Sequence, residues 1–354
     1  MSNKKYIATE GDGKDILHIL ESSAAKGNIE LLYTRRPDAY LSYMKETPDT
    51  QVFISHNKGR AVGTCAEIIR ETYINGQASK SAYICGLKKD ANYDGGLGFG
   101  MGFIRSLQRD DIDFYYCSVI SDNITAQKIF GKNGKAISMK PITEYRTYIL
   151  NPKIKIKSPK HDFTFTNATE DDKAELLDFL NCEGKKRDLF PVINSLEQFY
   201  GLTYNDFYLL KKNDKIVAAA ALWNQTEYKQ YIVKRYSLIM KIARIINPLL
   251  LFFKYVKLPK ENSPLDFPML SFFVCQNNDI NLYRIFLNEI KNEIAKEYSM
   301  FIFGMPKNNF AAPLVNKLPS IHFDTKIYEI KFPWSKQCYK QIDTNNFNPE
   351  CALL

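Results

Sequence analysis

The feature that most constrains the fold is a segment that occurs twice, 160 residues apart. Residues 8–20 and residues 168–180 both begin Ala-Thr-Glu, and an Asp and two Leu also coincide without a gap. Each copy reads as a short strand, an acidic helix start, and a helix with apolar residues at i, i+3 and i+4. The sequence therefore predicts two related units.

Two weaker internal similarities follow in the same order along the chain. Residues 52–63 and 207–218 each read as a β-hairpin, with turns at Asn57-Lys58-Gly59 and Asn213-Asp214. Residues 118–126 and 303–311 share an Asn and an Ala at matching positions. A length of 354 residues also suits two domains. We expect a tandem duplication with units at 1–150 and 163–333, a basic linker at 151–162 and a loose tail at 334–354.

Composition excludes several classes of protein. The chain has 48 Lys+Arg against 39 Asp+Glu, a net charge of +9 that is spread along the chain without a basic stripe, so nucleic acid is an unlikely partner. Seven Cys without a C-x-x-C pair and only four His argue against a disulfide framework and a metal site. The start lacks an apolar signal-peptide core, so we expect a cytoplasmic protein.

The longest apolar stretch, residues 238–254, is interrupted by Lys241, Arg244, Asn247 and Pro248. No uncharged run approaches the ~20 residues that a membrane span needs, so we expect no integral membrane segment. We expect a broken amphipathic segment buried between other elements. The alternative is a basic amphipathic helix lying on lipid.

A glycine-rich loop is the strongest chemical signal. It follows a predicted strand at residues 81–87, carries five glycines in positions 95–102, and precedes a predicted helix at 103–107. Glycines there let the backbone approach a ligand and leave the first N–H groups of the helix directed at an anion. The loop lacks the Gly-Lys-Ser/Thr ending of a Walker A motif. It predicts a phosphate or pyrophosphate site, with a plain glycine connector as the alternative.

The next predicted strand, residues 113–120, ends in Ser121-Asp122-Asn123 before a predicted helix at 126–132. On local physics, Asp122 or Asn123 could simply cap that helix. Together, the loop and this unit resemble the GNAT superfamily of acetyl-CoA-dependent N-acyltransferases. Residues 93–98 fit the family's Gln/Arg-x-x-Gly-x-Gly/Ala loop, with Gly96 and Gly98 on the glycine positions. The family's later motif resembles Asn123, Ala126, Phe130 and Gly134.

The resemblance implies an α/β fold with a mixed sheet (α+β) in two tandem GNAT-like domains. Acetyl-CoA would lie between the fourth and fifth strands of the first domain, and an acceptor amine would attack its thioester directly, with no metal. The residues implied to contact acetyl-CoA are Leu87, Gly95, Gly96, Leu97, Gly98 and Asn123.

Two positions depart from the family pattern: Tyr93 replaces the basic loop residue, and Phe130 replaces a tyrosine acid. A positive partner for phosphate could come from Lys88 or Lys89, although a solvated surface pair is the simpler interpretation. Thiolate departure would then rely on water, on Ser118 or on Tyr116, and the candidate base is Glu67. The alternative for Glu67 is an outward-facing strand carboxylate.

The second unit lacks glycines after its predicted strand at 268–275, so we expect a degenerate copy that binds no pyrophosphate. A helix is predicted at 282–295. Trp223 and Gln225 could line an acceptor cleft or pack at the seam between the units.

The sequence thus favours an acetyl-CoA-dependent N-acetyltransferase that acts on a small-molecule or peptide amine. A non-catalytic CoA-binding scaffold and an aminoacyl-tRNA-dependent transferase stay open as alternatives. The ending Cys351-Ala352-Leu353-Leu354 matches a prenylation motif, but no basic residue lies in positions 341–350, which favours a chance match.

Overall fold

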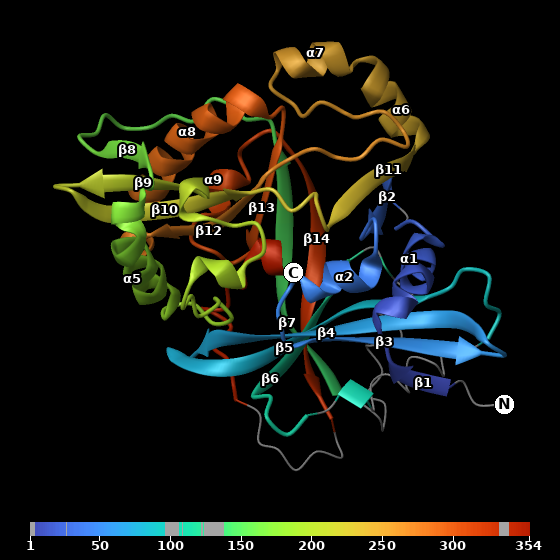
Figure 1. Cartoon of the computed structure of the whole chain (residues 1–354). Helices are drawn as coiled ribbons and strands as arrows, with labels where there is room; N and C mark the ends of the chain where they lie inside the picture. Colours follow the sequence, from blue (N-terminus) through green and yellow to red (C-terminus); the bar gives the residue numbers. More distant parts are fainter. Residues whose placement is uncertain are drawn as a thin grey trace.

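The computed structural model describes residues 4–25, 27–95, 106–107, 109–121, 123, 138–332 and 340–354. Most described strands form one twelve-stranded mixed sheet in the order β1-β3-β4-β5-β6-β14-β7-β13-β12-β10-β9-β8, shown in Figure 1. From the first half of the chain come β1 (Lys4–Ile7), β3 (Thr50–Asn57), β4 (Arg60–Ile74), β5 (Gln77–Lys89), β6 (Phe114–Ile120) and β7 (Ser138–Leu150). From the second half come β8 (Thr164–Asn167), β9 (Phe207–Lys212), β10 (Lys215–Trp223), β12 (Met269–Cys275), β13 (Phe301–Pro306) and β14 (Ser320–Lys331).

The helices cover the two halves of this sheet. In the first half, α1 (Gly13–Glu21) and α2 (Ala39–Met44) pack on the face of β3, β4 and β5 through Ile16, Ile19 and Tyr43. In the second half, α5 (Lys173–Gly184) packs on one face and α8 (Ile280–Glu297) on the other, each within its own apolar core. The helix predicted at 282–295 is therefore confirmed. The short helix α9 (Ala312–Val315) follows β13.

The twice-occurring segment has the same local structure in both places. Thr9 and Thr169 each begin a short 3-10 turn, and the carboxylates of Asp12 and Asp172 accept hydrogen bonds from the threonine N–H and hydroxyl at 2.8–3.0 Å. This reciprocal cap leads into α1 in one case and α5 in the other.

Both predicted hairpins are confirmed. Strands β3 and β4 turn at Lys58-Gly59, and β9 and β10 turn at Asn213-Asp214. All four turn residues have positive φ, as a two-residue hairpin turn requires, which explains the Asn, Asp and Gly at these positions.

The last long strand of each half crosses into the other half. β14 lies between β6 and β7, and β7 lies between β14 and β13, with Ser320 opposite Leu150 and Lys331 opposite Ser138. This exchange fuses what would be two sheets into one (Figure 1). The domain bounds given above stay a prediction.

A second, two-stranded sheet also joins the halves. β2 (Ile29–Thr34) pairs antiparallel with β11 (Gln230–Tyr236), and the paired residues are 196 to 207 positions apart in sequence. It holds the loop after β2 close to residues 225–229, where the candidate site lies.

Two expectations were wrong. The segment at 238–254 forms α6 (Leu238–Ile245) and α7 (Asn247–Phe252), and most of its large apolar side chains are exposed instead of buried. The tail is not loose where it is described: Phe347, Cys351, Ala352 and Leu353 are buried, and Figure 1 shows the chain ending near the middle of the molecule. The thiol of Cys351 is therefore inside the folded chain, which agrees with a chance match to a prenylation motif.

Candidate functional site

The site begins where two parallel strands part. β5 and β6 pair from Ser81 opposite Phe114 to Ile84 opposite Cys117, and there the pairing stops although both strands continue. The backbone of residues 85–89 in β5 is therefore not paired with the backbone of residues 118–120 in β6. Unpaired backbone N–H and C=O groups between parallel strands can hydrogen-bond an extended ligand.

A bulge in β5 marks the same position. Opposite β4, Thr64 faces Lys88 and Ala66 faces Cys85, so β5 holds one extra residue. Gly86 lies in this bulge with φ +60°, and a Cβ added there would come within 2.2 Å of the Tyr43 hydroxyl. Only glycine fits both the backbone conformation and the space, and a glycine bulge lets a ligand approach the backbone.

Three polar side chains line this part of the sheet. The hydroxyls of Tyr83 and Ser118 are 2.6 Å apart across the point where β5 and β6 separate, and the rings of Tyr83 and Tyr116 lie 5.1 Å apart. Burial raises the pKa of Tyr116 to about 12, with the Arg70 guanidinium opposing the rise. The phenol of Tyr116 therefore stays protonated at neutral pH. The structure thus brings together two of the predicted catalytic residues, Tyr116 and Ser118.

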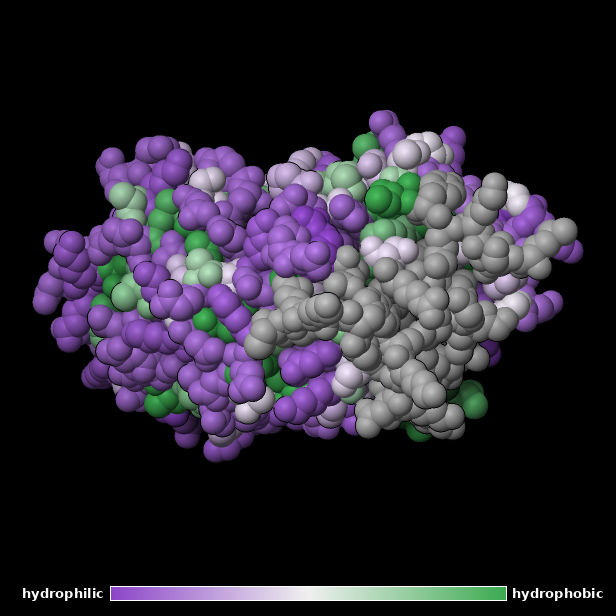
Figure 2. Space-filling model, turned by 90° about the horizontal axis from the view of Figure 1, so that it is seen from below, coloured by the Kyte–Doolittle hydropathy of each residue, from purple (hydrophilic) through white to green (hydrophobic). Residues whose placement is uncertain are grey.

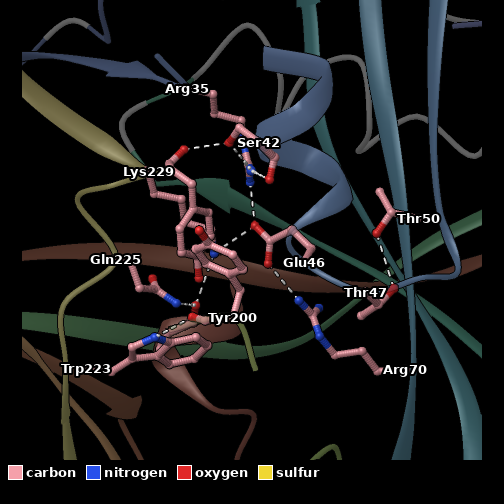
Figure 3. Close-up of polar contacts among 12 residues, drawn as sticks. Arg35, Ser42, Glu46, Thr47, Thr50, Arg70, Tyr200, Trp223, Gln225 and Lys229 are labelled. Carbon is pink, nitrogen blue, oxygen red and sulfur yellow. Dashed lines mark hydrogen bonds and ion pairs between the residues drawn. The ribbon is translucent and has the colours of Figure 1, made fainter. Parts of the chain in front are cut away.

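A buried ionic cluster lies on the same side of the sheet (Figure 3). The carboxylate of Glu46, just after α2, contacts Arg35 at 2.6 Å, Arg70 at 2.8 Å and Lys229 at 2.9 Å. The side chains of all four are at least nine-tenths buried. Burial raises the pKa of Glu46, but Lys229, Arg35 and Arg70 outweigh it and lower the pKa to about 2.

The cluster carries more positive than negative charge. One carboxylate faces three cations, and the Nε of Arg35 and both Nε and Nη1 of Arg70 have no hydrogen-bond partner in the described structure. Burying unmatched cations is costly. Burial also lowers the pKa of the Lys229 ammonium, as do Arg35 and Arg70, while Glu46 opposes them. A site of this kind stabilises negative charge that forms nearby.

Contacts connect this cluster to the bulge. The Arg35 guanidinium lies 3.8 Å from the centre of the Tyr43 ring, and the hydroxyl of Tyr43 lies against Gly86. Arg35 Nη1 also donates to the Ser42 hydroxyl at 3.1 Å, and Ser42 donates to the Tyr228 carbonyl at 2.5 Å. α2 therefore positions the bulge, the ionic cluster and a loop of the second half against one another.

The residues implied to contact CoA are described only in part. Leu87 lies on β5 beyond the last pair with β6, with about a third of its surface exposed. Gly95 begins the glycine loop, and the N–H of Asn123 donates to the Ile120 carbonyl in the turn after β6. Gly96, Leu97 and Gly98 lie outside the described residues.

The two lysines near the loop are not a solvated surface pair. Lys88 Nζ donates to the carbonyls of Leu20 and Ser23 at the end of α1, and burial lowers its pKa to about 8. Lys89 Nζ donates to the carbonyls of Tyr93 at 2.5 Å and Gly95 at 3.4 Å. In the structure, Lys88 thus stabilises the end of a helix, and Lys89 holds the start of the glycine loop.

The third predicted catalytic residue, Glu67, lies elsewhere. Along β4 it alternates with Ala66 and Ile68, which face α1 and α2, and so it shares the opposite face with Cys65 and Ile69. It is fully buried, both carboxylate oxygens lack a hydrogen bond among the described residues, and burial raises its pKa to about 8. It is therefore not an outward-facing carboxylate, and it is separated by the sheet from Tyr116 and Ser118.

The predicted acceptor residues pack inside the second half. Trp223 belongs to an aromatic core with Phe199 and Phe272, and its Nε1 donates to the Tyr200 carbonyl at 3.1 Å. Gln225 is buried and donates to the Ala352 carbonyl at 3.1 Å, as does Lys229. Both positions lie beside the ionic cluster (Figure 3), and their role in acceptor binding stays a prediction.

Comparison with known proteins identifies the architecture. No family model and no curated protein matches the chain. A GCN5-related N-acetyltransferase from Anabaena variabilis aligns over 94% of this chain and 73% of its own, with a TM-score of 0.56 and 9% identity. Saccharomyces cerevisiae N-myristoyltransferase with bound myristoyl-CoA aligns over 98% of this chain and 86% of its own, with a TM-score of 0.58 and 10% identity. The chain has the GNAT fold.

The fold expected from the resemblance is thus confirmed. At 9–10% identity the likeness establishes the fold alone. Within the described residues, no group of three or more His, Cys, Asp and Glu side chains is arranged to hold a metal ion. Within this fold, the parting of β5 and β6 and the bulge at Gly86 leave strand backbone that is not paired between these two strands.

Sequence reasoning missed the ionic cluster. Its members stand at positions 35, 46, 70 and 229, too far apart for any motif to connect them. One local signal was present: Gly86 interrupts a strand, which is typical of a bulge.

Proposed function

We propose that this protein is an N-acyltransferase that transfers an acyl group, with acetyl-CoA as the donor, to a primary amine of a small molecule or peptide. The observation that carries the proposal is the parting of β5 and β6 beside a glycine bulge, in a chain with the GNAT fold. The donor would lie along residues 85–89, with its thioester near Gly86.

The chemistry is one direct displacement. The amine nitrogen attacks the thioester carbonyl carbon, a C–N bond forms and the C–S bond breaks; the amine gives its proton to a base or to water, and the departing thiolate takes up a proton. Negative charge develops first on the carbonyl oxygen and then on the departing sulfur. Arg35, Arg70 and Lys229 share one carboxylate, and their excess positive charge favours that negative charge, while the hydroxyl of Tyr116 or of Ser118 can donate a proton to the thiolate.

The role of Glu67 as base stays a proposal of its own. A pKa near 8 suits a general base, but its position on the opposite face requires another path for the proton. The pH–rate profile tests it: a base of this pKa gives a rate that rises through pH 8, and Glu67→Gln removes that rise. A Glu67→Gln variant with an unchanged profile would exclude the role.

Calorimetric titration with acetyl-CoA tests the donor site, with Gly86→Ala compared against Gly59→Ala. Both glycines have positive φ, but an added Cβ meets the Tyr43 hydroxyl at Gly86 and open space at Gly59. We expect micromolar binding by wild type, at least about tenfold weaker binding by Gly86→Ala, equivalent to about 1.4 kcal/mol, and no change in Gly59→Ala. Adding Tyr43→Phe to Gly86→Ala should restore part of the affinity.

The length of the acyl chain is a separate question, because both an acetyltransferase and an N-myristoyltransferase share this fold. Titration with myristoyl-CoA beside acetyl-CoA decides between a short and a long acyl donor. If a folded wild-type protein binds neither, the proposal is overturned. If it binds a donor but releases no thiol with any amine, it is a CoA-binding scaffold. Retention of aminoacyl-tRNA in place of acyl-CoA would indicate the tRNA-dependent alternative.

A further inference from the structure

Helices α6 and α7 lie at the top of Figure 1, away from the sheet, and most of their large apolar side chains are exposed. Leu238, Ile245 and Phe252 expose 76–80% of their surface. Nine of the fourteen large apolar residues found exposed in the described chain lie between positions 238 and 255. We call the following side chains the α6–α7 surface: Leu238, Ile239, Ile242, Ile245, Ile246, Leu249, Phe252 and Phe253. Large apolar side chains that are exposed together in one short segment mark an interaction site.

The segment is fixed in place by its other face. Met240 and Ala243 pack against a core that includes Tyr236 and Val256. The buried Asn247 joins α7 to the returning chain, since its Nδ2 donates to the Val256 carbonyl at 3.0 Å and its Oδ1 accepts from the Leu258 N–H at 3.1 Å. The exposed apolar stripe is therefore presented on an anchored support.

The charged residues in the stretch of chain that contains α6 and α7 have one sign. Residues 230–260 contain seven Lys and Arg and no Asp or Glu. None of the seven forms an ion pair within the described part of the chain: Lys234, Arg235, Lys241, Arg244, Lys254, Lys257 and Lys260. An apolar stripe among cations is the pattern of a helix that binds anionic lipid headgroups and inserts its apolar side chains below them.

We propose that the α6–α7 surface docks the protein on an anionic lipid bilayer. The apolar stripe enters the headgroup region and the flanking cations meet lipid phosphates. No described helix is long and apolar enough to cross a membrane, so contact through α6 and α7 is interfacial. A second copy of the chain fits less well, because a two-fold contact through α6 and α7 would bring together two copies of a segment whose charged residues, Lys241, Arg244 and Lys254, are all cations.

The end of the molecule opposite α6 and α7 has a different surface character. Seen from below in Figure 2, the described residues at the surface are mainly hydrophilic, with apolar side chains in scattered groups. Docking through α6 and α7 therefore leaves these hydrophilic residues toward water.

Vesicle flotation of the full chain tests the proposal, with vesicles of phosphatidylcholine alone and of phosphatidylcholine with about 30% phosphatidylglycerol. The apolar variant is Ile242→Asp and its control Ile7→Asp, since these isoleucines are 60% and 57% exposed and only Ile242 lies on the α6–α7 surface. The charge variant is Lys241→Glu, and its control Lys14→Glu makes the same change at another exposed lysine. Circular dichroism confirms that each variant is folded.

We expect wild type to float with anionic vesicles and to be released in part by 0.5 M salt, with little flotation on neutral vesicles. Ile242→Asp and Lys241→Glu should each reduce the bound fraction at least about threefold, and both controls should bind as wild type does. Wild type that stays unbound with anionic vesicles, or binding that all four variants retain, would overturn the proposal. So would a dimer in light scattering that only Ile242→Asp dissociates, since that result would assign the surface to a second copy.

Discussion

The buried carboxylate of Glu46 offers the sharpest test of how the site is held together. Glu46→Gln keeps the shape of the side chain but removes the single negative charge that faces Arg35, Arg70 and Lys229. The three cations would then lie in the interior without a counter-charge. We expect a large loss of stability, because an unpaired buried charge is far more costly than a lost surface pair.

Two independent routes give the magnitude. Removing one partner of a buried ion pair costs about 3–5 kcal/mol. The pKa of Glu46, lowered from 4.5 to about 2, corresponds to about 3 kcal/mol, at about 1.4 kcal/mol for each tenfold change in the protonation equilibrium. Both values are a large part of the 5–15 kcal/mol by which typical domains are stable.

The same interaction has a defined pH dependence. Because the folded-state pKa of Glu46 is depressed, its contribution is fully present above pH 4.5 and is lost as the pH falls from about 4.5 to about 2. Wild type should therefore lose stability in this window by about 3 kcal/mol more than Glu46→Gln does.

Urea denaturation followed by tryptophan fluorescence measures the free energy of unfolding of each variant. The control is Glu227→Gln, whose carboxylate pairs with Lys45 at 2.8 Å on the surface and should leave the midpoint nearly unchanged. Glu46→Gln combined with Lys229→Met should be more stable than Glu46→Gln alone, because one unmatched cation is removed. If Glu46→Gln is as stable as the surface control, the cluster does not depend on its carboxylate and the electrostatic argument is refuted.

Two further predictions concern buried titratable groups. Burial raises the pKa of Glu67 to about 8, so the folded state keeps the proton of this carboxyl up to a higher pH than the unfolded state does. The free energy of unfolding of wild type should therefore fall by about 3 kcal/mol between pH 5.5 and pH 8, and that of Glu67→Gln should not. Parallel curves of unfolding free energy against pH for the two proteins would contradict this. The Cys351 thiol is buried with its pKa raised to about 12, whereas Cys182 is exposed. Iodoacetamide should therefore label Cys182 in the native protein and Cys351 only after unfolding, as peptide mass spectrometry would show, and early labelling of Cys351 would mean that the C-terminal segment opens.

The sequence predicted local structure well where neighbouring residues decide it. The hairpin turns at Lys58-Gly59 and Asn213-Asp214 follow from residues that accept positive φ. The caps at Thr9 and Thr169 follow from a carboxylate three residues later. The resemblance to the GNAT fold also rested on sequence order: a strand, then a glycine loop, then a second strand that ends in an Asn before a helix.

Prediction failed where burial depends on distant parts of the chain. The apolar stripe of α6 indicated that one face meets an apolar partner, and we assumed that the partner was the protein itself. Periodicity is the same for a helix packed on a core and for one left exposed, so only the tertiary structure shows that Ile239, Ile242 and Ile245 face outward.

The sequence by itself determined the local elements, their turns and caps, and the glycine loop, because these depend on residues close together in the chain. Only the tertiary structure decided that β7 and β14 exchange halves, that the tail is buried, and that Glu67 lies across the sheet from Tyr116. It alone placed Arg35, Glu46, Arg70 and Lys229 together. In this cluster the ion pair of Glu46 with Lys229 joins residues 183 positions apart, and its strength comes from exclusion of water by the whole fold, which no local pattern records.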